Sequence, residues 1–466
     1  MLFSSVTFLY YFLPAVLVVY FVVPGRWKNA VLLLASLLFY AWGEPRFSII
    51  MVTTAMTGYL SGRIIEQLKG EKLRKAVLIT GLILVLCPLL LFKYGDFFIR
   101  NIDQVFPGML SPLGLVLPIG VSFYTFQILS YVIDVYRREV DVEKNPFYFL
   151  MYVSFFPQLI AGPIVRFQTI QKEIRNRKVT LELFASGITR FVTGLGKKIL
   201  IANLLAEFGQ QLSLAGTRSV LSLWAGALAF TFQIYFDFSG YSDMAIGLGR
   251  MFGFQFLENF DYPYLSQSIT EFWRRWHMSL GSWFRDYVYI PLGGSRVSSW
   301  KMIRNLWVVW LLTGFWHGAS WNFVVWGFFY FILLQMERIG LSKILDKAGS
   351  AVRIIYTFFF VNLGFVLFNA DSLTEALSNI GGMFGGQALK LWDPLTLYYV
   401  KSYALVFLLA IIASTPYPKR LWERIRNRTS GFILDTVAAL GVFMVLFLST
   451  AQLVDGSFNP FLYFRF

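Results

Sequence analysis

Only two histidines occur in the 466-residue chain, His277 and His317, and each is a candidate for proton transfer near neutral pH. His317 lies within LLTGFWHGASWNFVVWG, where apolar and aromatic residues surround it. A polar ring is expensive to place in such a sequence, so we expect it to lie deep in the protein, facing a cavity or the bundle interior. Burial would favour its neutral form, which can act as a general base. The alternative is a structural histidine bonded to a backbone carbonyl.

His277 lies in EFWRRWHMSLGSWFRDYVYIPLGG, among charged side chains. The pattern predicts a polar, ionic environment for it. There His277 is either a second polar group at a reaction site or a member of an ion-pair network. Guanidinium groups match the oxygens of phosphates, so the arginines around it could bind a nucleotide-like donor or, equally, lipid headgroups. These arginines are Arg274, Arg275, Arg285 and Arg296.

A third polar cluster interrupts the apolar sequence QIYFDFSGYSDMAIGLG and contains Asp237, Tyr241 and Asp243. Its two carboxylates could be catalytic or bind a cation. Charged groups in a helical bundle usually pair, however, which favours contacts with Tyr, Ser and Arg side chains. No metal site is predicted, because the one cysteine, Cys87, excludes a cysteine-rich cluster and is expected to pack in the core. The remaining candidates for substrate or donor binding are Trp276, Asp286, Trp316 and Asn322.

The elements that position these residues are membrane helices. Hydrophobic residues make up 57% of the chain and charged residues 14%, whereas a soluble chain carries about 25% charged residues. At about 20 apolar residues per crossing, the chain is long enough for about 11–13 helices in one bundle. The net charge of +15 could suggest nucleic-acid binding, but the basic residues lie in short loops between apolar runs. We therefore predict an all-α integral membrane protein and exclude cytosolic enzymes and nucleic-acid-binding proteins.

Apolar stretches and their interruptions predict the order of the helices. The first stretch, 2–23, has no basic residue before Arg26, so we interpret it as a retained helix with an extracytoplasmic N-terminus. Two interrupted segments, 161–178 and 258–305, combine charge with Pro and Gly, and are predicted to be re-entrant or cavity-lining; a surface loop is the alternative. The other predicted helices cover 29–43, 47–65, 76–94, 112–136, 146–161, 183–213, 219–236, 240–256, 303–315, 321–337, 353–369, 400–415 and 431–451.

Three motifs, FDFSGYSDMAIGLG, ENFDYPYLSQSITEFWRRWHMSLGSWFRDYVYIPLGG and WHGASWNFVVWG, resemble the membrane-bound O-acyltransferases (MBOAT). Within that family they are most similar to the bacterial alginate O-acetyltransferase branch, as are the opening MLFSSVTFLYYFLP and the closing NPFLYFRF. The resemblance implies a polytopic bundle with re-entrant segments around a central funnel or tunnel. It implies a single domain, with N-terminal helices at 1–136, a catalytic core at 137–340 and C-terminal helices at 341–466. It also places the family's pair of functional histidines at His277 and His317.

The same resemblance implies a function. It predicts transfer of an acetyl group from a cytoplasmic donor, acetyl-CoA, toward a cell-surface polysaccharide such as alginate or peptidoglycan. It also predicts an extracytoplasmic O-acetyltransferase or acyl-acceptor protein as partner, no bound cofactor, and a place among the lipids of the bacterial inner (cytoplasmic) membrane. The residue types agree, because moving an acetyl group from a thioester to a hydroxyl needs a base such as His317. Direct transfer and a covalent acyl-histidine both fit.

Three other functions compete with acetyl transfer. The first is passage of D-alanine from a carrier protein toward teichoic acid, which differs in the donor. The second is a non-catalytic transporter or polysaccharide export component, in which Asp237, Asp243, His277 and His317 line a polar path. The third is a scaffold that recruits the extracytoplasmic partner, whose activity should survive changes at both histidines.

Overall fold

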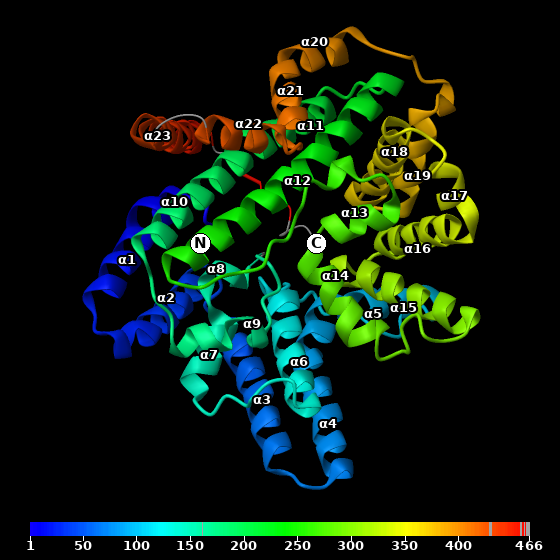
Figure 1. Cartoon of the computed structure of the whole chain (residues 1–466). Coiled ribbons are helices and arrows are strands. Elements are labelled where there is room, and N and C mark those ends of the chain that lie inside the picture. The colour runs from blue at the N-terminus through cyan, green and yellow to red at the C-terminus, as the bar shows by residue number, and fades with distance from the viewer. Residues whose placement is uncertain (161, 428–430, 457–458, 461, 463–466) are drawn as a thin grey trace. The chain divides into compact units, whose positions relative to one another are not determined.

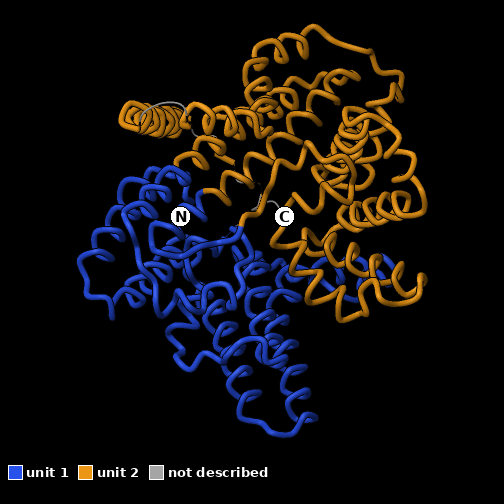
Figure 2. The backbone as a smooth tube through the Cα atoms, viewed as in Figure 1, with its two compact units in different colours: residues 1–191, 244–257 blue, residues 192–243, 258–466 orange. Residues whose placement is uncertain are grey.

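The computed structural model describes the whole chain except residues 161, 428–430, 457–458, 461 and 463–466. Its described elements are helices, with no strand among them (Figure 1). The chain divides into two compact units, residues 1–191 with 244–257 and residues 192–243 with 258–466 (Figure 2). All candidate site residues fall in the second unit.

The first unit is built mainly from helices of the N-terminal half. Their order follows the predicted apolar stretches, with π-helical turns at Phe8–Phe12 and Leu90–Tyr94. The helices are α1 (Leu13–Val22), α2 (Lys28–Gly43), α3 (Ser48–Gln67), α4 (Glu71–Leu89), α5 (Gly95–Val105), α6 (Val121–Arg137), α7 (Pro146–Ser154), α8 (Phe156–Leu159), α9 (Phe167–Arg175) and most of α10 (Leu181–Gly196).

The second unit contains the remaining helices. A π-helical turn, η4 (Lys197–Ala202), opens it, and a second one, η6 (Arg285–Tyr289), follows α14. The helices are α11 (Asn203–Leu214), α12 (Val220–Met251, whose last residues belong to the first unit), α13 (Ile269–Arg275), α14 (Met278–Phe284), α15 (Ser299–His317), α16 (Trp321–Met336), α17 (Ser342–Leu345), α18 (Ser350–Asn369), α19 (Leu373–Met383), α20 (Pro394–Ser402), α21 (Ala404–Ala413), α22 (Tyr417–Arg426) and α23 (Gly431–Asp455).

Five stretches of described helix are long and apolar enough to cross a membrane, or six if α20 and α21, bent by 54°, form one broken span. This is fewer than the 11–13 helices expected, because several predicted stretches form helices that are short or interrupted by π-helical turns. One prediction was wrong in the other direction. The stretches 219–236 and 240–256 lie largely within the single 32-residue helix α12, because Asp237 between them pairs with Lys198 inside the protein and does not break the helix.

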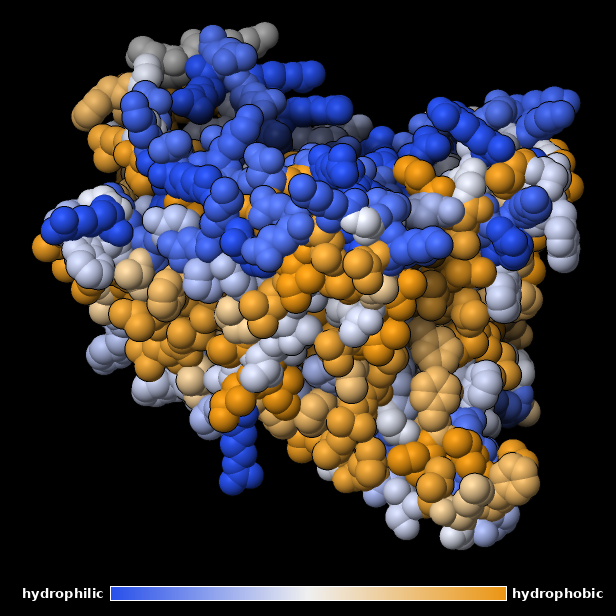
Figure 3. Space-filling view, turned by 90° about the horizontal axis from the view of Figure 1, so that it is seen from below, coloured by the Kyte–Doolittle hydropathy of each residue, from blue (hydrophilic) through white to orange (hydrophobic). Residues whose placement is uncertain are grey.

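Hydrophobic side chains cover much of the face shown in Figure 3, where they appear in orange. On α23 the exposed side chains include Leu440, Phe443 and Phe447. Cys87 is also exposed, on α4, which corrects the expectation that it packs in the core. A soluble protein rarely exposes so much apolar surface, so these helices are suited to contact with lipid.

The candidate site depends on close packing of α15 against α16. A Cβ atom at Gly314 would collide with the backbone oxygen of Phe323, and one at Gly327 with the backbone oxygen of Trp310. Neither backbone can move away without separating the two helices. Glycine at both positions therefore lets α15, which ends at His317, lie directly against α16.

Replacing Gly327 by alanine should destabilise the fold by about 1–3 kcal/mol, because the added methyl group overpacks this helix contact. Thermal unfolding in detergent measures the effect as a lower Tm. Gly209→Ala is the matched control, since Gly209 also lies in a helix but an added Cβ would meet nothing within 4 Å. Its Tm should stay the same or rise, because alanine favours helix over glycine. Equal destabilisation by both variants would contradict the packing argument.

Candidate active site

Helix α13 begins at a well-capped N-terminus. The Ser268 hydroxyl accepts a hydrogen bond from the Glu271 N–H at 3.0 Å. The buried carboxylate of Glu337 accepts from the N–H groups of Ile269 at 2.6 Å and Thr270 at 3.0 Å. An acidic group at a helix N-terminus satisfies free N–H groups and is favoured by the helix dipole. Glu337 thus fixes α13, and with it the residues that follow.

The connection from α13 to α14 is tied to the segment that follows α12. The Asp261 N–H donates to the Arg275 carbonyl oxygen, and the Met278 N–H to the Asn259 carbonyl oxygen, both at 3.0 Å. Between them His277 adopts a left-handed backbone conformation, with φ of 45° and ψ of 51°. Residues other than glycine rarely adopt it, and such conformations cluster at functional sites.

The imidazole of His277 contacts aromatic rings and the uncharged amide of Asn259, which corrects the ionic environment predicted from its neighbours in sequence. Its side chain is 2% exposed. The Phe238 ring lies perpendicular to the imidazole at a centroid distance of 4.6 Å, and the Trp316 ring is 5.8 Å away. Burial lowers the pKa of His277 to about 3, so the ring is neutral near neutral pH.

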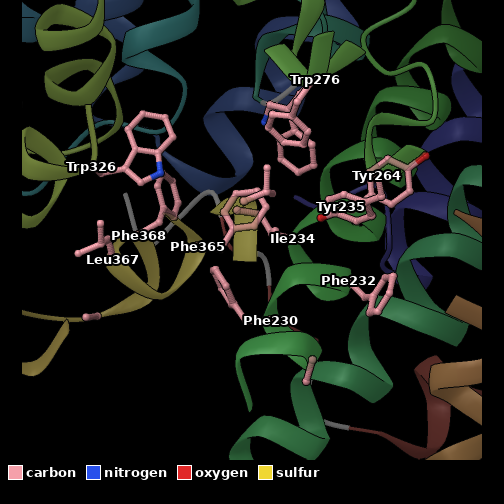
Figure 4. Packing of buried hydrophobic residues seen from close by; sticks show 14 of the residues in the cluster. Phe230, Phe232, Ile234, Tyr235, Tyr264, Trp276, Trp326, Phe365, Leu367 and Phe368 are labelled. Carbon is pink, nitrogen blue, oxygen red and sulfur yellow. The ribbon is translucent and has the colours of Figure 1, made fainter. Parts of the chain in front are cut away.

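His317 is the last residue of α15 and is half-buried, so it is less enclosed than His277. Its imidazole meets the rings of Trp316 at 5.0 Å and of Trp326 and Phe368 at 5.1 Å each, all nearly perpendicular to it. Figure 4 shows Trp326 and Phe368 side by side, from α16 and α18. The aromatic surroundings predicted for His317 are therefore present, but the deeper burial belongs to His277.

Trp316 brings the two histidines together. The indole of Trp316 contacts both imidazoles, with ring-centroid distances of 5.8 Å to His277 and 5.0 Å to His317. The residues are forty positions apart in sequence, and α13, α14 and α15 place them around one buried aromatic ring. In such an environment an imidazole can accept or donate a hydrogen bond, and one that is partly exposed can also take up and return a proton.

The arginines near His277 lie outside the buried part of the site. Arg274 is exposed, and so is Arg296. Arg275 pairs with Glu271 at 2.7 Å, within α13, and Arg285 pairs with its neighbour Asp286 at 2.7 Å. Exposed guanidinium groups remain accessible to an anionic ligand, and the pairs within α13 and η6 contribute little to stability.

The carboxylates of α12 are structural ion-pair partners. Asp237 pairs with Lys198 and Asp243 with Lys197, each at 2.7 Å. The sequence predicts pairing with Tyr, Ser and Arg side chains, whereas the structure shows ion pairs with two consecutive lysines of η4. Asp237 also accepts the N–H of Leu462 at 3.0 Å, and Lys198 donates to the Pro460 carbonyl oxygen, so this pair holds Leu462 and Pro460. The signal missed was two lysines inside the apolar stretch 183–213.

Three other candidates, Trp276, Tyr241 and Asn322, are buried in the second unit. Trp276 packs in the aromatic cluster shown in Figure 4, 5.2 Å from Phe365 and 6.1 Å from Tyr264. Tyr241 is 2% exposed on α12. Asn322 donates to the Ala370 carbonyl oxygen at 2.8 Å, a contact that fastens α16 to the end of α18.

Two further observations bear on the chemistry. Among the described residues, no group of three or more His, Cys, Asp and Glu side chains is placed to hold a metal ion. Asn259 was not among the predicted site residues, yet its side-chain oxygen lies 3.3 Å from His277 Nδ1. The one feature of the sequence that points to Asn259 is its place in ENFDYPY, at the start of the motif that contains His277.

Comparison with known proteins identifies the family. Residues 140–370 match the MBOAT family, described as membrane-bound O-acyltransferase. A probable alginate O-acetylase of Azotobacter vinelandii is 37% identical, over all of this chain and all of the relative. The chain belongs to the membrane-bound O-acyltransferase family. A peptidoglycan O-acetyltransferase of Helicobacter pylori is 36% identical, covering 83% of this chain and 80% of the relative.

A teichoic acid D-alanyltransferase of Streptococcus thermophilus is more distant, at 27% identity over 71% of this chain and 88% of the relative. The family match covers both histidines and the helices α12 to α16 that position them. The protein is thus a multi-pass membrane O-acyltransferase, as the sequence predicts.

Proposed function

We propose that this MBOAT enzyme transfers an acetyl group from acetyl-CoA toward a hydroxyl group of a cell-surface polysaccharide. The observation that carries the proposal is the contact of both imidazoles with the buried indole of Trp316. The O-acetyltransferases of alginate and peptidoglycan are more similar to this chain than the teichoic acid D-alanyltransferase is, which favours acetyl over D-alanyl transfer.

In the proposed reaction, His317 is the general base. Its ring removes the proton of the acceptor hydroxyl while the hydroxyl oxygen attacks the thioester carbonyl carbon. The new C–O bond forms, the C–S bond breaks, and the proton passes from His317 to the leaving sulfur, giving the O-acetyl product and free CoA. The half-exposed position of His317 allows this proton exchange, and the rings around it limit hydrolysis of the thioester.

His277 has a different role in this scheme. With a pKa near 3 it is a poor base but stays neutral, so one ring nitrogen is free to accept a hydrogen bond from a substrate. Direct transfer requires only this contact and the base. A covalent acyl-histidine would instead form at a ring nitrogen of His317, and rapid-quench labelling of the protein distinguishes the two routes.

The exposed arginines Arg274 and Arg285 are proposed to bind the phosphates of CoA at the cytoplasmic face. The double variant Arg274→Gln/Arg285→Gln should raise KM for acetyl-CoA by about five- to tenfold, because two charge-assisted contacts are lost, and leave kcat nearly unchanged. The difference should shrink at high salt. Lys419→Gln, an equally exposed basic position on α22, is the control and should not change KM.

The identity of the acyl donor is tested by separate transfer assays with the two candidate donors. Vesicles containing the purified enzyme receive either labelled acetyl-CoA or a D-alanylated carrier protein. Release of CoA with transfer of label supports the proposal, and transfer from the carrier alone would replace it by D-alanyl transfer.

Location and partner complete the proposal. Because the donor is made in the cytoplasm and the acceptor lies outside it, we propose that the enzyme lies in the inner membrane. Its partner in this scheme is an extracytoplasmic acetyltransferase or acyl-acceptor protein. The N-terminus is proposed to be extracytoplasmic. The basic residues Arg26 and Lys28, directly after α1, support this orientation.

A further inference from the structure

Asn259 lies beside His277 and is 1% exposed. It belongs to the segment between α12 and α13, and its backbone carbonyl oxygen already anchors the start of α14 through Met278. Its side-chain oxygen, Oδ1, is 3.3 Å from His277 Nδ1. The same oxygen accepts from the Ser279 N–H at 3.2 Å and from the Ser279 hydroxyl at 2.9 Å. On the other side, Nδ2 donates to the Ser242 hydroxyl at 3.2 Å.

These contacts fix which way the Asn259 amide points. A backbone N–H can only donate, so the atom facing the Ser279 N–H must be the carbonyl oxygen. The reversed amide would place its NH₂ group against that N–H and lose the bond. Because the Ser242 hydroxyl can accept, the orientation observed satisfies both ends of the amide.

The amide orientation determines the tautomer of His277. The Oδ1 atom can only accept, so the hydrogen between it and the imidazole must be carried by Nδ1 of His277. In a neutral ring Nε2 then has a free lone pair. This Nε2 atom is buried and has no hydrogen-bond partner among the described residues. A buried acceptor without a partner is expensive to keep unless a ligand satisfies it.

We propose that Asn259 is a positioning residue that holds His277 as the Nδ1–H tautomer, so that Nε2 accepts a hydrogen bond from an O–H or N–H group of the substrate. The substrate part of this inference rests on the proposed acyl transfer, whereas the tautomer does not. The rings of Phe238 and Trp316 pack against the imidazole of His277, which restricts the rotation of its side chain.

Nuclear magnetic resonance of ¹⁵N-histidine tests the tautomer without substrate. The chain has two histidines, so the spectrum contains two imidazoles, and the His317→Gln variant assigns the remaining one to His277. We expect Nδ1 of His277 to carry the hydrogen in the wild type, although free histidine favours hydrogen on Nε2. Hydrogen on Nε2 of His277 in the folded wild type would overturn the proposal.

Variants of Asn259 separate positioning from general packing. Asn259→Asp keeps an acceptor toward Nδ1 and toward Ser279, and the Ser242 hydroxyl can turn to donate, so the tautomer should be kept. Asn259→Leu removes the acceptor, and the His277 signal should shift toward the Nε2–H form. Ser242→Ala removes only the bond on the far side of the amide and should keep the wild-type tautomer. A tautomer that is unchanged in folded Asn259→Leu would refute the role of Asn259.

Activity then tests the substrate contact. Acetyl transfer by Asn259→Leu should fall by about tenfold to a hundredfold, as at other sites where a histidine loses the partner that orients it, and Asn259→Asp should recover most of it. If the variants change the tautomer as expected but transfer acetyl groups at the wild-type rate, the substrate contact is wrong. If the wild-type protein itself transfers no acetyl group, the proposed function is refuted instead. The spectra would still test the tautomer of His277.

Discussion

Replacing His317 by alanine should lower acetyl transfer by about 10²- to 10⁴-fold, the contribution expected of a positioned general base. The imidazole is the group available at the end of α15 to remove the hydroxyl proton, and the rings of Trp326 and Phe368 cannot do so. Transfer of label from acetyl-CoA, measured in vesicles at a fixed amount of folded protein, gives the rate. Binding of acetyl-CoA should change little, so the loss appears in kcat.

The control lies one turn earlier in the same helix. Thr313 is buried, and its hydroxyl donates to the Val309 carbonyl oxygen at 2.8 Å within α15. Thr313→Val keeps the shape and should keep at least about half of the activity, since a hydroxyl bonded within its own helix contributes little net free energy. Acetyl transfer retained by His317→Ala would exclude the general-base role of this histidine.

Replacing Lys198 by methionine should destabilise the protein by about 3–5 kcal/mol, because it leaves the carboxylate of Asp237 buried without its cation. The side chains of this pair are 2% and 4% exposed. The substitution would also remove the hydrogen bond from Lys198 to the Pro460 carbonyl oxygen. A lower Tm in detergent measures the effect.

The double variant Lys198→Met/Asp237→Leu should recover most of that stability, since no buried charge is left without a partner. The neighbouring pair supplies the matched control. Lys197 is 25% exposed, so Lys197→Met should lower Tm less than Lys198→Met does. Equal effects at the two lysines, or no recovery in the double variant, would contradict the assignment of Lys198 and Asp237 as a buried structural pair.

The helical class and most helix positions follow from apolar periodicity, because a membrane helix must satisfy its backbone internally and present apolar side chains to lipid. Periodicity does not report how polar side chains inside a helix are satisfied. Asp237 interrupts an apolar run in the sequence and predicts a break there, yet Lys198 of η4 neutralises it and α12 continues past it. The partner lies in another element, which sequence spacing does not reveal.

The two histidines illustrate the same limit. Their identity as candidates follows from their rarity and from the motifs around them. Their environments do not follow from sequence. The charged neighbours of His277 along the chain lie on α13 and η6, whereas its ring, after a left-handed turn, contacts Phe238 and Trp316. Asn259 was missed for a related reason, since its role depends on hydrogen bonds to residues on either side of it in sequence.

The most direct test of the account uses purified protein in lipid vesicles, with acetyl-CoA labelled in the acetyl group, and compares wild type with His317→Ala. Release of free CoA and the position of the label, on protein, lipid or added acceptor, are followed together. We predict that the wild type moves the label off CoA and that His317→Ala, folded to the same Tm, does not. Equal transfer by both proteins, or transfer only from a D-alanylated carrier, would contradict acetyl transfer at this histidine.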